Sequence, residues 1–408
     1  MHRSEELKEK AVRARNKKAM IGPDVDLDQF ENEPVPHGYL GAEGLQALPE
    51  AERERLIMSG LDPDGKDRGG TFLQMDSEVV HCSARQEGVE VISIREALET
   101  CDWLRDYYWK LVAVDMDKYT AAAELDLENG YVIRALPGSK SIYPVQAGLY
   151  LHKEGHRQTV HNIIIAEEDS ELHIINGCAT SPHLKKGAHV GISEFFVKKN
   201  AKLTFTMIHN WAEEMAVRPR SAARVEAGGL FLSNYICMKP VRSLQMYPVT
   251  HLAGEDAVAR FCSIIMGSPG SEYDVGGRVF LEKTGCRAEI IARTISNGGK
   301  IIARGHLIGR VPGIKAHLEC KGLILNGGAI RAIPELEGHA DGVEMSHEAA
   351  VGKIAQEEIC YLMSRGLSED EATATIVRGF LSVDIPGLPA PLKAEIDRAI
   401  EESDKDMM

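Results

Sequence analysis

Two cysteines and one histidine–glutamate pair have the side-chain types that bind metal ions or carry sulfur. Cys178 lies in the segment INGCATSPH, where a β-prone run gives way to a turn. A thiol at such a position becomes reactive when it is partly exposed and its pKa is lowered. Most free cysteines are instead buried as small apolar side chains, so the pattern alone favours a structural role for Cys178.

The other candidates lie in KAHLECKGLIL and in the SHEAAV segment that follows the last β-prone run. Leu318, Cys320 and Gly322 share one face if their segment is a strand, and this pattern alone predicts a core position for Cys320. His347 and Glu348 are predicted to open a helix, where the helix dipole stabilises a carboxylate. A thiolate, an imidazole and a carboxylate together suit iron or zinc. Their spacing in the sequence leaves open whether they meet.

Most other catalytic patterns are absent from the sequence. It has no G-x-x-x-x-G-K-[ST] phosphate loop, no G-x-G-x-x-G after a strand and no G-x-S-x-G nucleophile elbow. Val351 stands where an H-E-x-x-H zinc motif needs its second histidine, which argues against a zinc protease. The eight cysteines include no C-x-x-C pair, so a metal site must be assembled from distant residues or from two subunits.

The composition is that of a globular chain with an acidic surface. Of 408 residues, 44% are hydrophobic and 26% are charged, and the formal net charge is −14. The charge is uneven, because residues 1–20 hold seven Lys/Arg and three Asp/Glu, or +4, and the remainder is therefore −18. An acidic surface repels phosphates, so we expect no nucleic-acid partner. We also expect no membrane span and no secretory signal, because no long apolar run is present. Eight cysteines in a chain of this length fit a reducing cytoplasm better than a disulfide framework.

The chain divides into three regions that differ in their pattern of helix-prone, β-prone and turn residues. Residues 1–118 combine helical patterns with loops rich in proline and glycine. Residues 119–345 are a succession of short β-prone runs separated by turns, without the intervening helices of a βαβ fold. A sandwich, a barrel or a β-helix would each close the edges of so many strands. Residues 346–408 have helical spacing.

Helices are predicted at both ends of the chain. In the first region, the helical patterns cover residues 1–20, 49–58 and 95–118. In the last region, one helix is predicted from Ser346 to Gly366. A second is opened by a capping box in which Ser368 is reciprocated by Glu371, and a short third helix is expected near residues 391–403.

The C-terminal stretch resembles a known protein family. MSHEAAVGKIAQEEICYLMSRGLSEDEATATIVRGF is similar to the C-terminal signature of the SufB/SufD family, the scaffold subunits of the SUF iron–sulfur cluster assembly system. The segments around Cys178, His189 and Trp211 resemble the sulfur-entry region of that family. The segment around Cys320 resembles the one with the cluster-building cysteine. The resemblance covers residues 120–383.

This resemblance implies a mainly β protein with a right-handed parallel β-helix core, flanked by N-terminal and C-terminal helical regions. It also implies a SufC-like ATPase that docks on the C-terminal helices. Such a partner would explain how a chain without a phosphate loop belongs to an ATP-driven machine. The residues expected to contact this ATPase are Tyr361, Leu362, Arg365, Arg378 and Phe380.

The resemblance also implies roles for individual residues. Cys178 matches the cysteine that accepts persulfide sulfur, and Cys320 matches the cysteine on which the cluster is built. Glu348 matches a cluster ligand of SufB. His347 matches the position at which SufD supplies a histidine to the subunit interface.

Two departures from the family pattern bear on the sulfur route. Residues 327–328 are glycines in the region where other members carry a second cysteine after the cluster-building one. Tyr150 and His152 do not match the polar residues that line the family's sulfur path before Cys178. Direct delivery of sulfur, as sulfide, therefore remains an alternative to transfer through Cys178.

Together these residues predict a homodimeric scaffold rather than an enzyme. Each protomer would give Cys320, His347 and Glu348 to a transient iron–sulfur cluster on the two-fold axis, in the commonest oligomer geometry. The expected partners are the ATPase, a second copy of the chain, a sulfur donor and apo iron–sulfur proteins. A SufD-like structural subunit that needs a separate SufB is the main alternative. A β-helix enzyme that acts on acidic polysaccharide is the remaining one.

Overall fold

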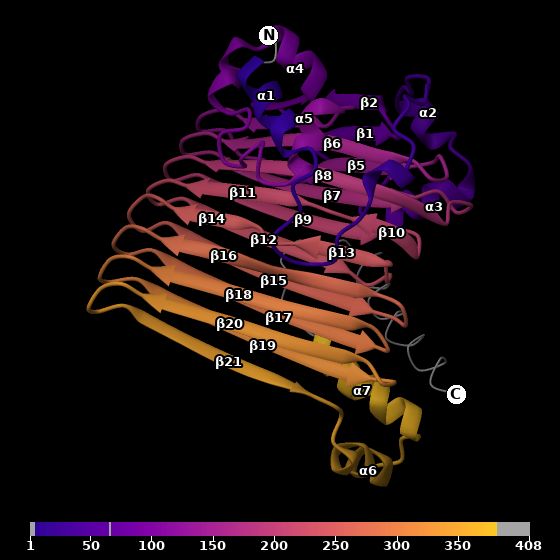
Figure 1. Ribbon diagram of the computed structural model, residues 1–408, viewed down its shortest axis with the longest axis vertical. Helices are drawn as coiled ribbons and strands as arrows, with labels where there is room; N and C mark the ends of the chain where they lie inside the picture. Colours follow the sequence, from indigo (N-terminus) through magenta and orange to yellow (C-terminus); the bar gives the residue numbers. More distant parts are fainter. Residues whose placement is uncertain (1–4, 65–66, 382–408) are drawn as a thin grey trace.

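The computed structural model describes residues 5–64 and 67–381, and its centre is a parallel β-helix (Figure 1). Each complete coil contributes to two facing sheets, with one strand in the first sheet and one strand or two short ones in the second. The first sheet contains, in spatial order, β2 (Glu78–Ala84), β1 (Gly70–Met75), β5 (Val145–Leu151), β7 (Glu171–Thr180), β9 (Lys202–Asn210), β12 (Leu230–Cys237), β15 (Val258–Gly267), β17 (Arg287–Asn297), β19 (Lys315–Leu325) and β21 (Glu344–Gly352).

The second sheet covers the other side of the core. Its strands are β3 (Val89–Ser93), β4 (Tyr131–Ala135), β6 (Arg157–Ala166), β8 (Lys186–Val197), β10 (Glu214–Val217), β11 (Arg220–Val225), β13 (Ser243–Met246), β14 (Val249–Leu252), β16 (Glu272–Leu281), β18 (Lys300–Gly309) and β20 (Ala329–Gly338). The β1–β2 and β3–β4 pairs are antiparallel, and the other pairs in both sheets are parallel. The predicted parallel β-helix with helices at both ends is therefore confirmed.

The coils repeat closely in length but not in sequence. Val258, Arg287, Lys315 and Glu344 occupy equivalent positions on four successive strands of the first sheet, so one coil takes 28 or 29 residues. The side chains at this position differ in size and charge, which hides the period from a sequence comparison. Alternate residues of each strand point into the core between the sheets or out of it. We call these two directions the inner and the outer side of a sheet.

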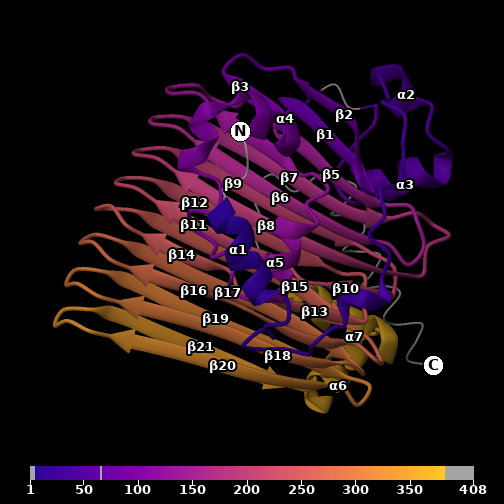
Figure 2. The same cartoon turned by 45° about the horizontal axis from the view of Figure 1, so that its top comes forward.

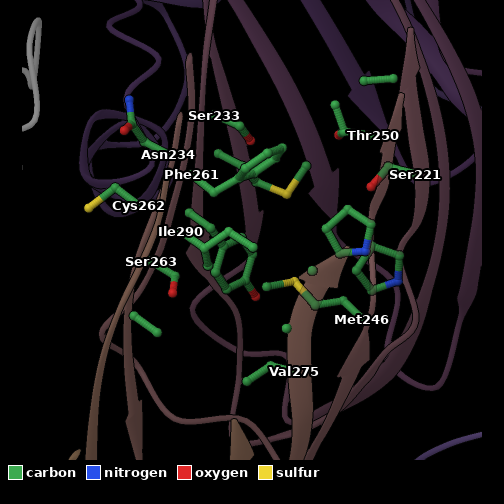
Figure 3. A pocket seen from close by; sticks show the side chains of 18 of the residues that line it. Ser221, Ser233, Asn234, Met246, Thr250, Phe261, Cys262, Ser263, Val275 and Ile290 are labelled. Atoms are coloured by element: carbon green, nitrogen blue, oxygen red, sulfur yellow. The ribbon is translucent and has the colours of Figure 1, made fainter. Parts of the chain in front are cut away.

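The core between the sheets is largely apolar and holds one elongated cavity in its middle coils (Figure 3). The cavity has a volume of about 100 Å³. Phenylalanine and methionine side chains from both sheets line it, together with small hydroxyl side chains such as those of Ser221, Ser233, Ser263 and Thr250.

The N-terminal helices cover the first coils. They are α1 (Glu5–Ala14), α2 (Ala42–Gln46), α3 (Glu50–Met58), α4 (Ile94–Thr100) and α5 (Lys118–Leu125), with 3₁₀ turns at Leu27–Gln29 and Asp102–Asp106. Contacts join α1 to α5, and α5 lies over β6 and β8 on the outer side of the second sheet (Figure 2). The helix predicted at 49–58 is confirmed. Those at 1–20 and 95–118 are shorter and more interrupted than expected.

The end of α3 lies against the first sheet close to Cys178. A Cβ atom added to Gly177 would come within 2.4 Å of the carbonyl oxygen of Ser59. Only glycine leaves room for this approach, and the segment after α3 therefore seals the outer side of β7.

One predicted helix is wrong in its first half. Residues 344–352 form β21, which pairs with β19 over nine residues, and α6 (Gln356–Ser364) begins only after this strand. His347 and Glu348 therefore stand on a strand rather than in a first helical turn. The alanines of SHEAAV favour a helix, but the backbone hydrogen bonds and contacts offered by β19 outweigh that local preference.

The last described helix is α7 (Glu369–Leu381). Its predicted capping box is confirmed: the Glu371 carboxylate accepts from the Ser368 amide at 2.8 Å, and the Ser368 hydroxyl accepts from the Glu371 amide at 3.2 Å. Val377 and Leu381 pack on the outer side of the first sheet. The helix predicted near 391–403 lies outside the described residues. Among the helices within them, none has the length and apolar character needed to cross a membrane.

Candidate functional site

Cys320 lies on the inner side of β19, near the last coil. Its exposed fraction is 2%, and Leu318 and Gly322 point the same way, as predicted. Burial, with a smaller contribution from the negative charge of Glu319, raises the pKa of the Cys320 thiol to about 11. The side chain is therefore a protonated thiol at neutral pH until a metal ion or a structural opening changes its surroundings.

His347 shares the inner side with Cys320. It is the cross-strand partner of Leu318, and Ala349, two residues further on, is the partner of Cys320. Although it points inward, His347 is exposed, because β21 is the last strand of the first sheet and no further coil covers it. The His347 imidazole and the Cys320 thiol are thus diagonal neighbours on adjacent strands at the open end of the β-helix.

Glu348 points to the opposite side of the sheet. Its cross-strand partner is Glu319, on the outer side of β19, and its carboxylate lies 3.1 Å from the Lys321 ammonium. The three residues predicted to share a metal ion are therefore divided by the sheet. Within one chain, Cys320 and His347 face inward and Glu348 faces outward.

Cys178 lies within β7 and is fully buried, as the pattern alone favoured, although the strand continues two residues beyond it. The Asn176 side-chain amide donates to its sulfur at 3.3 Å. The Tyr131 hydroxyl donates to the Asn176 side-chain oxygen at 2.8 Å and so fixes the orientation of that amide. Burial raises the pKa of Cys178 well above its usual value, although the Asn176 hydrogen bond works against this.

Cys178 and Cys320 face the same core from the same sheet. Cys178 is on β7 and Cys320 on β19, five strand steps away, which corresponds to about 24 Å at the usual strand spacing. Cross-strand partners on the inner side connect Asn176, beside Cys178 on β7, to Cys320 on β19. The partners on the four strands between them are Met207, Tyr235, Ser263 and Ala292. These four intervening residues all line the cavity (Figure 3). The empty space therefore lies between the two cysteines.

The sequence interpretation missed a group of buried polar residues beside Cys178. His209 is its cross-strand partner, and Cys237 follows on the next strand. The Tyr235 hydroxyl is 2.8 Å from His209 Nδ1, while His209 Nε2 and Trp211 Nε1 have no hydrogen-bond partner. Polar residues at inward-pointing strand positions are the signal of such a group. His209 and Cys237 can be assigned to these positions only when the strand register is known.

The last coil presents two free strand edges. Among the described residues, β20 pairs only with β18, and β21 pairs only with β19. No described segment covers the inner side chains at this end, and Leu336 is 38% exposed and Val351 is 41% exposed. Unpaired edges next to exposed apolar side chains are normally covered, because they would otherwise aggregate.

Comparison with known proteins agrees with this geometry. Residues 149–380 match the family model of the SufBD core domain of the SUF system for iron–sulfur cluster assembly. The chain belongs to the SufBD family. An iron–sulfur cluster assembly SufBD family protein of Methanothermobacter thermautotrophicus is 49% identical over 410 residues, which cover 98% of each chain. One of Archaeoglobus fulgidus is 54% identical over 358 residues, covering 88% of this chain and 96% of the relative.

SufB of Bacillus subtilis, named as an iron–sulfur cluster assembly protein, is 29% identical over 366 residues, or 87% of this chain and 78% of the relative. The family resemblance inferred from the C-terminal signature is therefore confirmed. The matched SufBD core extends from β5 to the end of α7, so it includes Cys178, Cys320, His347 and Glu348.

In this SufBD protein, α6 projects beyond the last coil of the β-helix, whereas α7 lies against the first sheet (Figure 1). On α6, Tyr361 is 59% exposed, and Arg365 stacks on its ring and donates to its hydroxyl at 3.3 Å. Leu362 is half-buried and Arg378 is exposed. Phe380 turns toward the sheet, where its ring lies 6.0 Å from the Arg293 guanidinium. All five residues predicted to bind the ATPase thus keep some accessible surface, although Phe380 is turned toward the sheet.

Proposed function

We propose that this protein is a scaffold on which iron–sulfur clusters are assembled and from which they are transferred, and that it acts without catalysing a reaction of its own. The observation that carries this proposal is the pairing of a buried thiol and an exposed imidazole, Cys320 and His347, on the inner side of an uncovered β-helix end. A soft thiolate and an imidazole suit iron. A site built on a strand edge releases its cargo more readily than a closed four-cysteine cage.

We propose that the working form is a homodimer joined at this open end. The free edges of β20 and β21 and the exposed Leu336 and Val351 favour a self-complementary contact. A second copy there would bring two thiols and two imidazoles to one axis. Glu348 faces away from Cys320 in its own chain. The second copy would also place each Glu348 beside the free strand edges of the other chain. The missing local cluster loop is then replaced by ligands from two chains.

A SufC-like ATPase is the proposed partner at α6 and α7. The exposed pair of Tyr361 and Arg365 offers an aromatic and a cationic contact, which are favoured at the centre of protein interfaces. Because α6 follows directly on β21, movement of the helices by the ATPase would pull on the strand that carries His347 and Glu348. ATP binding to the partner would in this way open the site to iron and sulfur.

Sulfur has two candidate routes in this proposal. Cys178 is the proposed persulfide acceptor, and the cavity between Cys178 and Cys320 would be the path to the cluster. The complete burial of Cys178 favours the second route, in which sulfide enters directly at the open end. Apo iron–sulfur proteins would then take the cluster from the same end. The cytoplasm, where thiols stay reduced, is the proposed compartment.

Anaerobic reconstitution with ferrous iron and sulfide tests the scaffold role. We expect a visible chromophore on the wild type, its loss in Cys320→Ser and its retention in Cys262→Ser. Cys262 is a matched control because it is buried at 3% exposure on the outer side of the same sheet. A wild type that stays colourless, even with a SufC-like ATPase and ATP, would contradict the proposal and favour a SufD-like structural subunit.

A further inference from the structure

A histidine and two glutamates meet on the outer side of the last two strands of the first sheet. His317 and Glu319 alternate along β19 and point outward, and Glu348 is the cross-strand partner of Glu319 on β21. One ligand atom from each of these three side chains lies within 4.8 Å of the other two. One nitrogen and two oxygens at this spacing form a donor set for a divalent metal ion.

The imidazole is held in the way that metal-binding histidines are usually held. His317 Nδ1 is 2.8 Å from the Ser346 hydroxyl oxygen, on the strand opposite. This hydrogen bond fixes the ring and leaves Nε2 as the free nitrogen. Glu319 is held by the Arg293 guanidinium from the neighbouring strand β17. Two of the three donors are therefore oriented by residues outside the donor set.

The two carboxylates would repel each other without a cation between them. Like charges at directly opposite positions destabilise a pair of strands. Here the Lys321 ammonium lies 3.2 Å from Glu319 and 3.1 Å from Glu348, and so bridges them. Partial burial alone would favour a neutral Glu319, but the hydrogen bonds and charges of Arg293 and then Lys321 outweigh it and lower its pKa. The Lys321 ammonium thus occupies the position between the two carboxylates, where a positive charge is stabilised.

We propose that His317, Glu319 and Glu348 form a binding site for a divalent first-row metal ion, with ferrous iron as the physiological cargo. The identity of the ion rests on the proposed scaffold function, whereas the site rests on the geometry alone. The ion displaces the Lys321 ammonium, which swings out into solvent on its flexible stem. Glu348 serves this site instead of sharing a mononuclear ion with Cys320 of the same chain, because the sheet separates them.

The arrangement keeps iron and thiol apart until the edge strand moves. Glu319 and Cys320 are consecutive on β19, so an ion bound by Glu319 lies one peptide unit from the thiol but on the other side of the sheet. Among the described strands, β21 is the only one that pairs with the outer edge of β19. Displacement of β21, which carries Glu348 and His347, would release one oxygen ligand and open the inner side at the same time.

Equilibrium dialysis of full-length protein against ferrous iron, under anaerobic conditions and without sulfide, tests this site. We expect one ion per chain on the wild type. His317→Ala and Ser346→Ala should each weaken binding by at least about tenfold, the usual cost of losing a ligand or its hydrogen-bond partner. Lys321→Ala should tighten binding, because it removes the competing cation. Glu289→Gln, an outer carboxylate on β17 beside this group, should leave binding unchanged.

Cobalt(II) serves as a second probe, because its visible bands report nitrogen and oxygen ligands without any redox change. Cys320→Ser should bind both ions as the wild type does. Loss of binding in Cys320→Ser with retention in His317→Ala would overturn the proposal, as would a wild type that binds neither ion. Weaker binding in Lys321→Ala would also overturn it, because lysine would then be part of the site. Binding of iron by a wild type that forms no chromophore with sulfide would support this site while removing the scaffold function.

Discussion

Cys320 and Glu348 lie on neighbouring strands but on opposite sides of the sheet that those strands form. Cys320 faces the apolar core with Leu318, and Glu348 faces solvent beside Lys321. A cluster held by both residues therefore cannot sit within one chain at rest. It requires either the edge strand β21 to move or a second chain to bring its own Glu348 around the open end.

The two cysteines should differ in their effect on cluster assembly. Cys320→Ser should abolish the chromophore, because it removes the inner-side thiol on the strand that pairs with β21 at the open end. Cys178→Ala should reduce assembly only in part when sulfide is supplied, because Cys178 is buried about 24 Å away. Visible absorption and acid-labile sulfide measure both effects. Equal loss in the two variants would remove direct delivery of sulfide as a route.

A charge on the open end should separate the proposed dimer. Val351→Arg places a cation on an exposed inner position of β21, and its burial against a second chain would cost several kcal/mol. We expect the variant to be monomeric by light scattering coupled to size-exclusion chromatography, while the wild type is dimeric. Val12→Arg is the matched control, since Val12 is also exposed but lies on α1 at the other end. A wild type that is monomeric at high concentration would refute the homodimer.

The packing of α7 should be sensitive to the loss of the two buried methyl groups of Val377. Val377 is 1% exposed against the outer side of the first sheet. Val377→Ala should lower the free energy of α7 docking by about 2 kcal/mol, through lost contacts and the cavity that remains. Hydrogen exchange in residues 369–381 should then become faster. The control Thr375→Ala, at an exposed position of the same helix, should leave exchange nearly unchanged.

Stability should fall as the pH drops below the ordinary pKa of histidine. Burial lowers the pKa of His189 to about 3, and burial with the nearby His189 charge lowers that of His209 well below its usual value. Both rings stay neutral in the folded protein, whereas the unfolded chain takes up protons below about pH 6.5. The folded state should therefore lose up to about 1.4 kcal/mol per pH unit for each ring between that pH and the folded pKa.

Urea unfolding at pH 7 and pH 5 measures this dependence. His189→Gln keeps an amide that donates to Gln158, as His189 Nδ1 does at 3.0 Å, but has no proton to gain. Its stability should change less between the two pH values than that of the wild type. An identical change in both proteins would show that His189 is protonated in the folded state.

The fold was predictable from short strands, turns and a family signature, but the register was not. The runs between residues 119 and 345 became strands, and Leu318, Cys320 and Gly322 share a side because alternation is a local property. Whether Glu348 meets Cys320 depends on how β21 aligns with β19, which no spacing within SHEAAV encodes. A one-residue change in that alignment would exchange the sides of His347 and Glu348.

Two local predictions failed for related reasons. INGCATSPH carries turn signals after Cys178, but β7 continues to Thr180 because the coils on both sides offer hydrogen-bond partners. SHEAAV has helix-favouring alanines, but β19 offers an unpaired strand edge. In a β-helix, each coil is a template for the next, so pairing with a neighbour overrides the propensity of a short segment.

The ratio of clusters to chains tests the central claim most directly. Native mass spectrometry of the anaerobically reconstituted protein measures chain number, iron and sulfide in one particle. The account predicts a dimer that carries one cluster, a cluster-free dimer in Cys320→Ser and cluster-free monomers in Val351→Arg. A monomer that carries a complete cluster would contradict it, because the cluster would then form without ligands from a second chain.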